Sequence, residues 1–252
     1  YEIIPRFSRK PIYSYNSGVF AFVLLSIVGF SSWAHHMYAT GMSFTEKTVF
    51  MVGTLAAVPA SAMHVFNFIA TMWNGRIKFS TPMMWAVGGI ALFFSAGAGG
   101  VANAAMPLDF TTHDTYWVVG HFHLFVMGTI AFGSIGFLYY MFPYVTGRMY
   151  NEKMGKVHFV MSFIGTVLVF FTQHVLGLYG MPRRVFDYPP IPEWIAMNQI
   201  ATVGAMIIGV SMVIFLANMI YSSGKGALAN TEDPFGVGGK YYYPFEAKNP
   251  SH

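Results

Sequence analysis

The chain has 252 residues, of which 55% are hydrophobic, 18% are aromatic and only 10% are charged. A soluble domain carries about a quarter charged residues, so this composition excludes an ordinary soluble protein and places the chain in a membrane. Its lack of cysteine excludes disulfides, thiolate-ligated haem and iron–sulfur clusters, and leaves histidine and oxygen as metal ligands.

Six apolar runs are long enough to cross a bilayer as helices, since about twenty residues suffice. They are residues 18–40, 48–73, 81–105, 115–143, 157–179 and 194–221. Six crossings put both ends on one side, and all 14 Lys and Arg residues except Lys47, Arg183 and Arg184 fall on that side. The positive-inside rule therefore places both termini in the cytoplasm, and this distribution argues against a nucleic-acid partner despite the net charge of +4.

The sequence thus predicts an all-α, polytopic membrane bundle over residues 1–221 and an inner-side tail over residues 222–252. Residues 1–16 are basic and short of apolar residues, and we expect them to form a loop. The first residue is Tyr rather than Met, so we expect a processed chain or a segment of a longer polypeptide.

The first span ends at the segment WAHHMY, residues 33–38. Adjacent helical residues point about 100° apart, so His35 and His36 can both reach one metal ion if the end of the helix is irregular. Neutral imidazole suits copper, zinc or non-haem iron. The alternative is a pair of interfacial histidines that are hydrated among the lipid headgroups.

The second span carries Pro59, Ser61 and His64 near its middle. Ser61 and His64 are three residues apart and share a helix face. An ionisable group at this depth is a candidate proton relay, and the alternative is a histidine that bonds a carbonyl freed by Pro59. Asn67 and Thr71 follow on a similar face and are candidates for hydrogen bonds between helices.

The third span contains a run of small residues, 95–100, which lets helix backbones approach closely in lipid and indicates packing. A loop is expected over residues 106–112, before His113 and Asp114. With Asp109 nearby, these side chains offer carboxylate and imidazole ligands for a hard cation. An ordinary solvated helix cap is the alternative.

The fourth span opens with HDTYWVVGHFH, residues 113–123, on which the chemical interpretation rests. Residues two apart on a helix point to nearly opposite sides, so His121 and His123 each face a different partner. Imidazoles inside hydrocarbon need partners, and metal is a common one for neutral histidine. The alternative is two core histidines that are bonded to neighbouring helices.

Two adjacent arginines, Arg183 and Arg184, lie on the outer side, against the positive-inside rule. Arginine binds carboxylates through paired hydrogen bonds. An anionic ligand such as a haem propionate would therefore explain the pair, and lipid phosphate is the alternative.

Four segments together resemble the catalytic subunit, subunit I, of the haem–copper oxidases: WAHHMYATGM, THDTYWVVGHFH, FFTQHVLGLYGMPRR and DYP. The resemblance covers nearly the whole chain. It corresponds to the second half of that subunit, helices seven to twelve, and implies half of a twelve-helix fold.

The resemblance implies roles for the central residues. His121 would be the axial ligand of the high-spin haem, His123 would ligate the low-spin haem, and Phe122 would lie between the two haems. His35 and His36 would be two of the three histidine ligands of copper.

It also implies roles towards both membrane surfaces. His113 and Asp114 match a magnesium site, and Arg183 and Arg184 match the pair that binds haem propionates. The lysine that the family carries on helix eight is replaced by His64, with Ser61 near the usual hydroxyl. We therefore expect Ser61 and His64 to form part of a proton path.

The implied activity is reduction of O₂ to water at the haem–copper centre, coupled to proton translocation, with two haems and copper as cofactors. Cytochrome c or quinol would donate the electrons, and the sequence favours neither. Since the family's remaining haem and copper ligands lie on helices two and six, we expect a companion chain or N-terminal segment carrying helices one to six. Subunit II, other oxidase subunits and membrane lipid are the further partners expected, in a prokaryotic plasma membrane rather than a mitochondrial inner membrane.

Other functions fit parts of the pattern. A nitric oxide reductase of the same superfamily shares the paired histidines but needs glutamates near a non-haem iron, and none of the six apolar runs contains a glutamate. A histidine-based proton-coupled transporter would be colourless, so an absorption spectrum distinguishes it. A structural subunit without metal would leave the concentration of histidines in and beside the spans unexplained.

Overall fold

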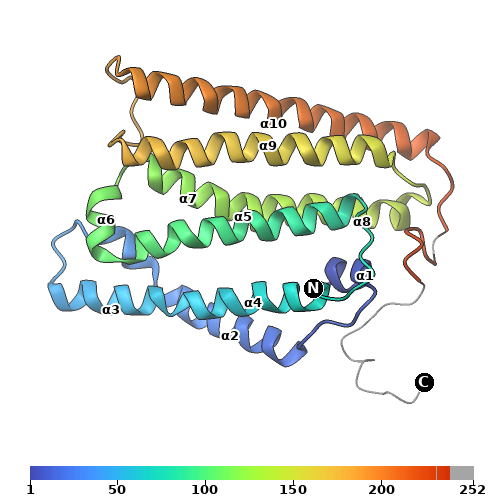
Figure 1. Ribbon diagram of the computed structural model, residues 1–252, viewed down its shortest axis with the longest axis horizontal. Coiled ribbons are helices and arrows are strands. Elements are labelled where there is room, and N and C mark those ends of the chain that lie inside the picture. Colours follow the sequence, from blue (N-terminus) through green and yellow to red (C-terminus); the bar gives the residue numbers. More distant parts are fainter. Residues whose placement is uncertain (231, 239–252) are drawn as a thin grey trace.

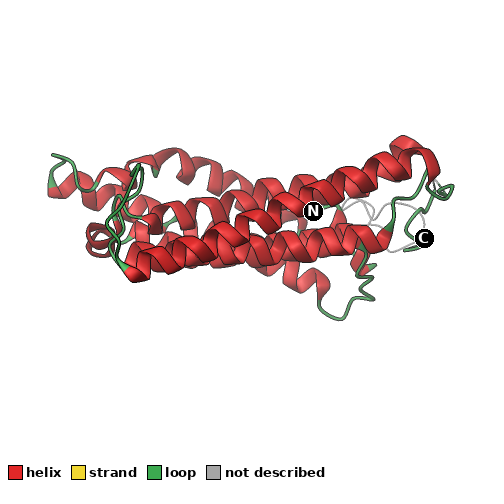
Figure 2. Ribbon diagram, turned by 90° about the horizontal axis from the view of Figure 1, so that it is seen from above, coloured by secondary structure: helices red, strands yellow, loops and turns green. Residues whose placement is uncertain are grey.

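The computed structural model describes residues 1–230 and 232–238 as a bundle of long helices (Figure 1). Six segments are long and apolar enough to cross a membrane: Tyr15–Met37, Phe44–Met72, Thr81–Ala104, Tyr116–Thr146, Glu152–Leu178 and Pro192–Lys225. Figure 2 shows the helices extending along one long axis. The prediction of an all-α, six-span membrane bundle is confirmed.

The described chain contains helical elements joined by short connecting segments. They are α1 (Ile3–Ser8), α2 (Tyr15–Ser31), the 3₁₀ turn η1 (Trp33–Met37), α3 (Phe44–Leu55), α4 (Ala57–Met72), α5 (Thr81–Ala104), α6 (Met106–Thr112), α7 (Tyr116–Val126), the π-helical turn η2 (Met127–Ala131), α8 (Phe132–Thr146), α9 (Glu152–Leu178) and α10 (Pro192–Lys225).

Caps set the helix ends beyond the limits of the apolar runs. α9 begins at Glu152 because the side chain of Asn151 accepts a hydrogen bond from the Met154 amide, as an N-cap residue does. α10 likewise continues to Lys225, past the last apolar residues. Hydropathy marks the membrane boundary, whereas the helix itself continues until a residue caps it.

The second span is interrupted near its middle. α3 ends at Leu55 and α4 begins at Ala57. Pro59 lies inside α4, has no backbone N–H to donate to the Leu55 carbonyl, and its ring crowds that oxygen. The break therefore falls four residues before the proline.

Two segments that we expected to be loops are short helices. Within residues 1–16, α1 buries Ile4 and Phe7, which are three residues apart and share one helix face. Residues 106–112 form α6, which has Pro107 in its first turn, a position where proline favours a helix start. Both loop predictions were wrong because a helix of one or two turns is too short to give a periodic hydrophobic signal.

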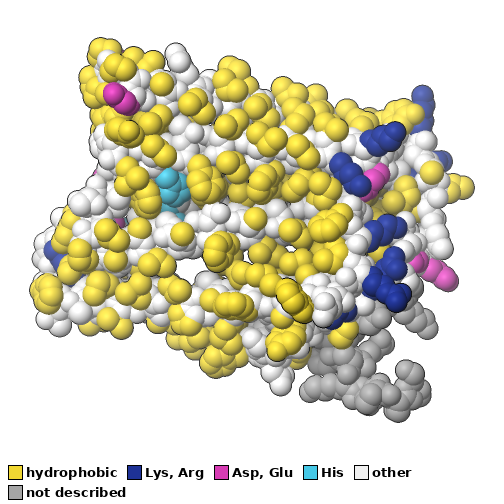
Figure 3. All heavy atoms as spheres, in the orientation of Figure 1, with side chains coloured by type: hydrophobic (Ala, Val, Ile, Leu, Met, Phe, Trp, Pro, Cys, Tyr) yellow, Lys and Arg dark blue, Asp and Glu magenta, His cyan; other side chains and the backbone are white. Residues whose placement is uncertain are grey.

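The largest core cluster includes Phe7, Trp85, Phe132 and Tyr139. The described part of the tail joins it, since Phe235 lies 5.1 Å from the Phe7 ring and stacks on Tyr140 at 5.8 Å. Figure 3 shows Lys and Arg gathered at the end of the bundle where α10 ends. The rest of the predicted tail, with Lys240 and Lys248, lies outside the described residues.

Candidate functional site

His121 and His123 extend from α7 towards different helices. Nδ1 of His121 lies 2.9 Å from the carbonyl oxygen of Ala96 in α5. The ring of His123 stacks on Phe170 of α9, with centroids 5.0 Å apart and planes within 9°. The prediction that these imidazoles face different partners is confirmed.

Both histidines keep one ring nitrogen available. Nδ1 of His123 lies 2.8 Å from the Val119 carbonyl oxygen. A carbonyl can only accept, so each Nδ1 carries the proton and each Nε2 carries a lone pair. Metal-ligating histidines bond their second nitrogen in this way, which fixes the tautomer and raises ligand basicity. The two histidines thus fit the role of iron ligands, and bonds to neighbouring carbonyls account for only one nitrogen of each ring.

The small residues of α5 form the surface against which His121 lies. A methyl group added at Gly100 would meet Cε1 of His121 at 3.0 Å, and one added at Gly99 would meet Nδ1 at 3.3 Å. Larger side chains would push α5 away from the imidazole. The packing role predicted for the third span is confirmed here.

His35 and His36 lie in η1, where the helix tightens into a 3₁₀ turn. Their ring centroids are 4.0 Å apart with planes tilted by 53°, and Nδ1 of His35 is 3.3 Å from the Thr54 hydroxyl. The irregular end that the sequence required is therefore present.

The histidine pair in η1 has no third metal ligand beside it among the described residues. Among the described residues, no group of three or more His, Cys, Asp or Glu side chains is arranged to hold a metal ion. The pair at His35 and His36 supplies two neutral imidazoles, which suit copper.

An ion-pair cluster covers the N-terminal end of α7. Arg183 Nε donates to Asp114 Oδ1 at 2.7 Å, and this bond lowers the pKa of the Asp114 carboxyl. His113 lies 3.4 Å from Asp109 and 3.5 Å from Asp114. Burial raises the pKa of the Asp109 carboxyl, although His113 opposes that shift. Since the Asp114 carboxylate is already bonded to Arg183, the geometry gives the expected magnesium ion no support.

The adjacent Arg183 and Arg184 differ in their ion-pair partners. Arg183 also donates its backbone N–H to the Asp114 carbonyl at 2.9 Å, so Asp114 is its anion within this chain. Arg184 has a left-handed backbone with φ of 63°, which costs a non-glycine residue free energy. It forms no ion pair with a carboxylate of the described residues.

His64 is buried in α4 and bonds the hydroxyl of Tyr1, with Nδ1 and the oxygen 2.6 Å apart. Its partner is thus a side chain and not a carbonyl freed by Pro59. Nε2 of His64 is buried without a partner in the described structure, and Ser61 is half-buried one turn away. Asn67 and Thr71 accept hydrogen bonds from the residues that lead into α2, as predicted for interhelical partners.

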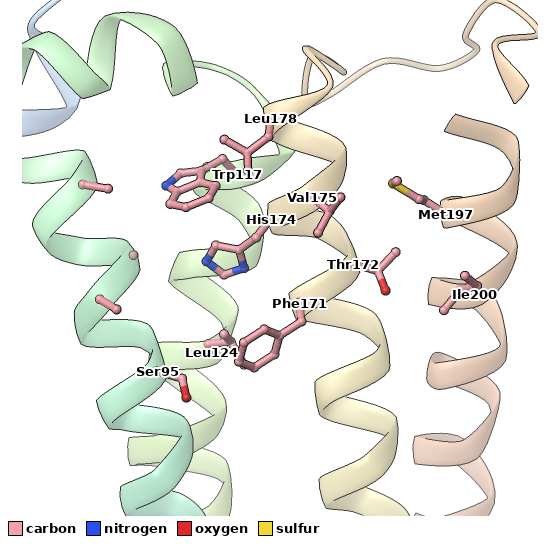
Figure 4. A pocket seen from close by; sticks show the side chains of 13 residues that line it. Ser95, Trp117, Leu124, Phe171, Thr172, His174, Val175, Leu178, Met197 and Ile200 are labelled. Carbon is pink, nitrogen blue, oxygen red and sulfur yellow. The ribbon is translucent and has the colours of Figure 1, made fainter. Parts of the chain in front are cut away.

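His174 of α9 has no role predicted from the sequence. This residue lines a cavity of about 590 Å³ between α5, α7, α9 and α10 (Figure 4). The cavity wall is otherwise mostly apolar, with Trp117, Phe171 and Val175 among its residues. In the sequence, the only sign of this residue is the Gln-His pair within FFTQHVLG. Its position in the structure depends on glycines in two other helices, which the local sequence does not show.

The family model described as cytochrome c and quinol oxidase polypeptide I matches residues 1–207. The chain belongs to this family. The resemblance to the second half of subunit I of the haem–copper oxidases is thereby confirmed.

Several relatives carry names of the same family. The chain is 41% identical over 254 residues to the probable cytochrome c oxidase subunit 1-beta of Nocardia farcinica, covering 100% of this chain and 42% of that protein. It is 44% identical over 225 residues to cytochrome c oxidase subunit 1 of Bacillus sp. PS3, covering 89% and 36%. The chain therefore spans less than half the length of these relatives.

A solved structure shares the fold. A heme-copper terminal oxidase dimer superposes with a TM-score of 0.77 at 21% identity, covering 88% of this chain and 44% of that one. Family membership implies haem and copper as cofactors and a multi-pass place in a membrane. The free Nε2 atoms of His121 and His123 and the imidazole pair in η1 fit these cofactors.

Proposed function

We propose that this chain supplies one half of the catalytic subunit of a respiratory terminal oxidase that reduces O₂ to water and couples this reaction to proton translocation. The supporting observation is the arrangement on α7. His121 and His123 each donate Nδ1–H to a carbonyl, keep Nε2 free and face different helices. One rigid helix can then bind two haems at a fixed separation.

The central residues receive distinct roles in this proposal. His121 binds the high-spin haem iron and His123 binds the low-spin haem iron, while His35 and His36 bind copper. When bound, these metals supply the electrons for O₂ reduction. Phe122 lies between the two iron ligands in sequence and is 55% exposed, so it is free to contact both haems.

The proposal places a proton path on the inner side of the site. Neutral His64 can accept a proton at Nε2 and release one through Nδ1 to the Tyr1 hydroxyl, 2.6 Å away. Ser61, one turn along α4, offers a hydroxyl on the same face. Replacement His64→Leu should slow turnover and proton uptake together, and unchanged proton uptake would contradict this part of the proposal.

The outer arginines complete the haem pocket. Arg184 forms no ion pair with a carboxylate of the described residues, and its planar guanidinium matches a haem propionate. Arg183 is shared with Asp114. A magnesium ion at His113 and Asp114 stays a prediction, and it would require Asp114 to exchange Arg183 for the metal.

The chain requires partners to complete these sites. We propose a companion chain or segment with helices one to six, which brings the second low-spin haem ligand and the third copper ligand. Subunit II and other oxidase subunits, membrane lipid, and cytochrome c or quinol as donor follow from the family. We further propose a bacterial plasma membrane with both termini on the cytoplasmic side, since the basic residues gather at that end of the bundle (Figure 3).

Metal analysis of the complete oxidase tests the proposal. A pyridine haemochrome spectrum with copper quantification should show two haems and copper. His123→Leu should lose the low-spin haem, His121→Leu the high-spin haem, and His36→Leu the copper. His158→Leu is the matched control, because His158 is buried and bonds Tyr139 at 3.0 Å in the inner core.

The outcomes separate the candidate functions. Iron in place of copper would indicate a nitric oxide reductase, and a colourless complex would indicate a transporter. Retention of both haems in His121→Leu and His123→Leu would overturn the assignment of these ligands.

A further inference from the structure

His174 occupies a junction of three helices. It is 9% exposed and its Nδ1 donates to the Phe170 carbonyl at 2.7 Å. Its ring meets Trp117 of α7 edge-on, with centroids 4.8 Å apart. Figure 4 shows the ring extending from α9 towards α5, beside Trp117. The side chain is therefore held in one orientation, with Nε2 directed away from its own helix.

Two glycines make room for this ring. A methyl group at Gly120 of α7 would lie 2.6 Å from Nδ1 of His174, and one at Gly99 of α5 would lie 3.0 Å from Nε2. Real side chains do not approach so closely, so the imidazole fills the space that both missing side chains leave. His174 thereby sets the separation of α5 and α7 at this level.

This level is also that of His121. Gly120 precedes His121 in α7, and the methyl position at Gly99 lies 3.3 Å from Nδ1 of His121. Ala96, whose carbonyl accepts the His121 proton at 2.9 Å, lies one turn from Gly99. One turn of α5 thus touches His174 on one side and His121 on the other.

We propose that His174 is a positioning residue for His121, which holds the Ala96–Gly100 turn of α5 against the His121 ring and so sets the strength of the bond between Nδ1 and the Ala96 carbonyl. The inference rests on the proposed function, in which Nε2 of His121 binds iron. A stronger Nδ1–H bond makes the opposite nitrogen a more basic ligand. The position of α5 therefore sets the strength of the iron–histidine bond, because α5 contacts the nitrogen of His121 that does not bind iron.

Resonance Raman spectroscopy of the complete, reduced oxidase measures this bond through the iron–histidine stretching band. His174→Leu removes the wedge, and Gly99→Ala pushes α5 away from both rings. Gly99→Ala should move the band to lower frequency, and His174→Leu should shift or broaden it, while the low-spin haem spectrum stays unchanged. His158→Leu is the control on the same helix, since His158 contacts Trp85 and Tyr139 and should leave the band in place.

Every outcome decides between the alternatives. A wild-type band in both fully haem-loaded variants overturns the proposal, as does an equal shift in His158→Leu. If His174→Leu does not assemble, His174→Gln, which keeps a neutral polar side chain, is judged by the same band. A His121→Leu enzyme that retains the band refutes the ligand assignment itself, so failure of the proposed function is recognised separately.

Discussion

The contact between the outer ends of α7 and α9 predicts that Gly177→Ala destabilises the protein. A methyl group at Gly177 would lie 2.0 Å from the backbone nitrogen of Trp117 and 2.6 Å from its Cα. Backbone atoms cannot rotate away, so α7 and α9 would have to separate by more than 1 Å before ordinary contact beyond 3.4 Å is restored. Overpacking costs about 1–3 kcal/mol, and we take the upper end because the obstacle is backbone.

The added methyl also has a favourable effect, because alanine is better than glycine inside a helix by about 0.5–1 kcal/mol. The expected net loss in unfolding free energy is therefore about 2 kcal/mol. For a chain of this size, this loss lowers the melting midpoint by roughly 4–8 °C.

Thermal unfolding of the detergent-solubilised oxidase, followed by haem release, measures this shift. Gly209→Ala in α10 is the matched control, since no atom of the described residues lies within 4 Å of the added methyl. It should raise the midpoint slightly or leave it unchanged. Equal midpoints for Gly177→Ala and wild type would refute the claim that direct backbone contact holds these helices.

Two further predictions concern the two surfaces of the bundle. At the outer surface, the Arg183 bond lowers the pKa of Asp114, so this carboxylate contributes stability above its unfolded pKa of about 3.9 and loses it as the pH falls through the lower folded value. Asp114→Asn should therefore be less stable than wild type at pH 6. The loss of unfolding free energy should not exceed about 1 kcal/mol, because the Asp114 side chain is 60% exposed. The difference in stability should shrink as the pH falls, and a difference that grows in acid would contradict the predicted direction of the pKa shift. At the other surface, Phe235→Ala removes a ring buried against Phe7 and Tyr140. This change should lower the free energy that holds the tail in place by about 2–3 kcal/mol, so limited proteolysis should cut the tail faster. An unchanged cleavage rate would show that the ring does not hold the tail.

The sequence alone predicted the six spans and the directions in which the two histidines of α7 point. The 100° rotation per residue predicted that His121 and His123 face different helices, and hydropathy predicted all six spans. It could not identify the Ala96 carbonyl or the Phe170 ring as their contacts. In lipid, apolar surface does not choose which face of a helix turns inward, so small residues and polar contacts between helices decide it.

His174 illustrates what remained beyond sequence reasoning. A histidine on an apolar helix gives no sign of its neighbours, and its meaning comes from Gly99 and Gly120 in two other helices. The run of small residues indicates close packing, but the sequence does not show which ring packs against it. The short helices α1 and α6 were missed because each buries only one turn.

The ring of Phe235 has a consequence for the order in which the molecule is made. It belongs to the portion of this sequence that is synthesised after α10, yet it closes over Phe7 near the beginning. Segments synthesised early can pack before later ones leave the ribosome, but Phe235 covers the Phe7 ring only after all six crossings have been synthesised. A truncated product ending at α10 would leave the Phe7 and Tyr140 rings uncovered, where quality-control proteases can find them.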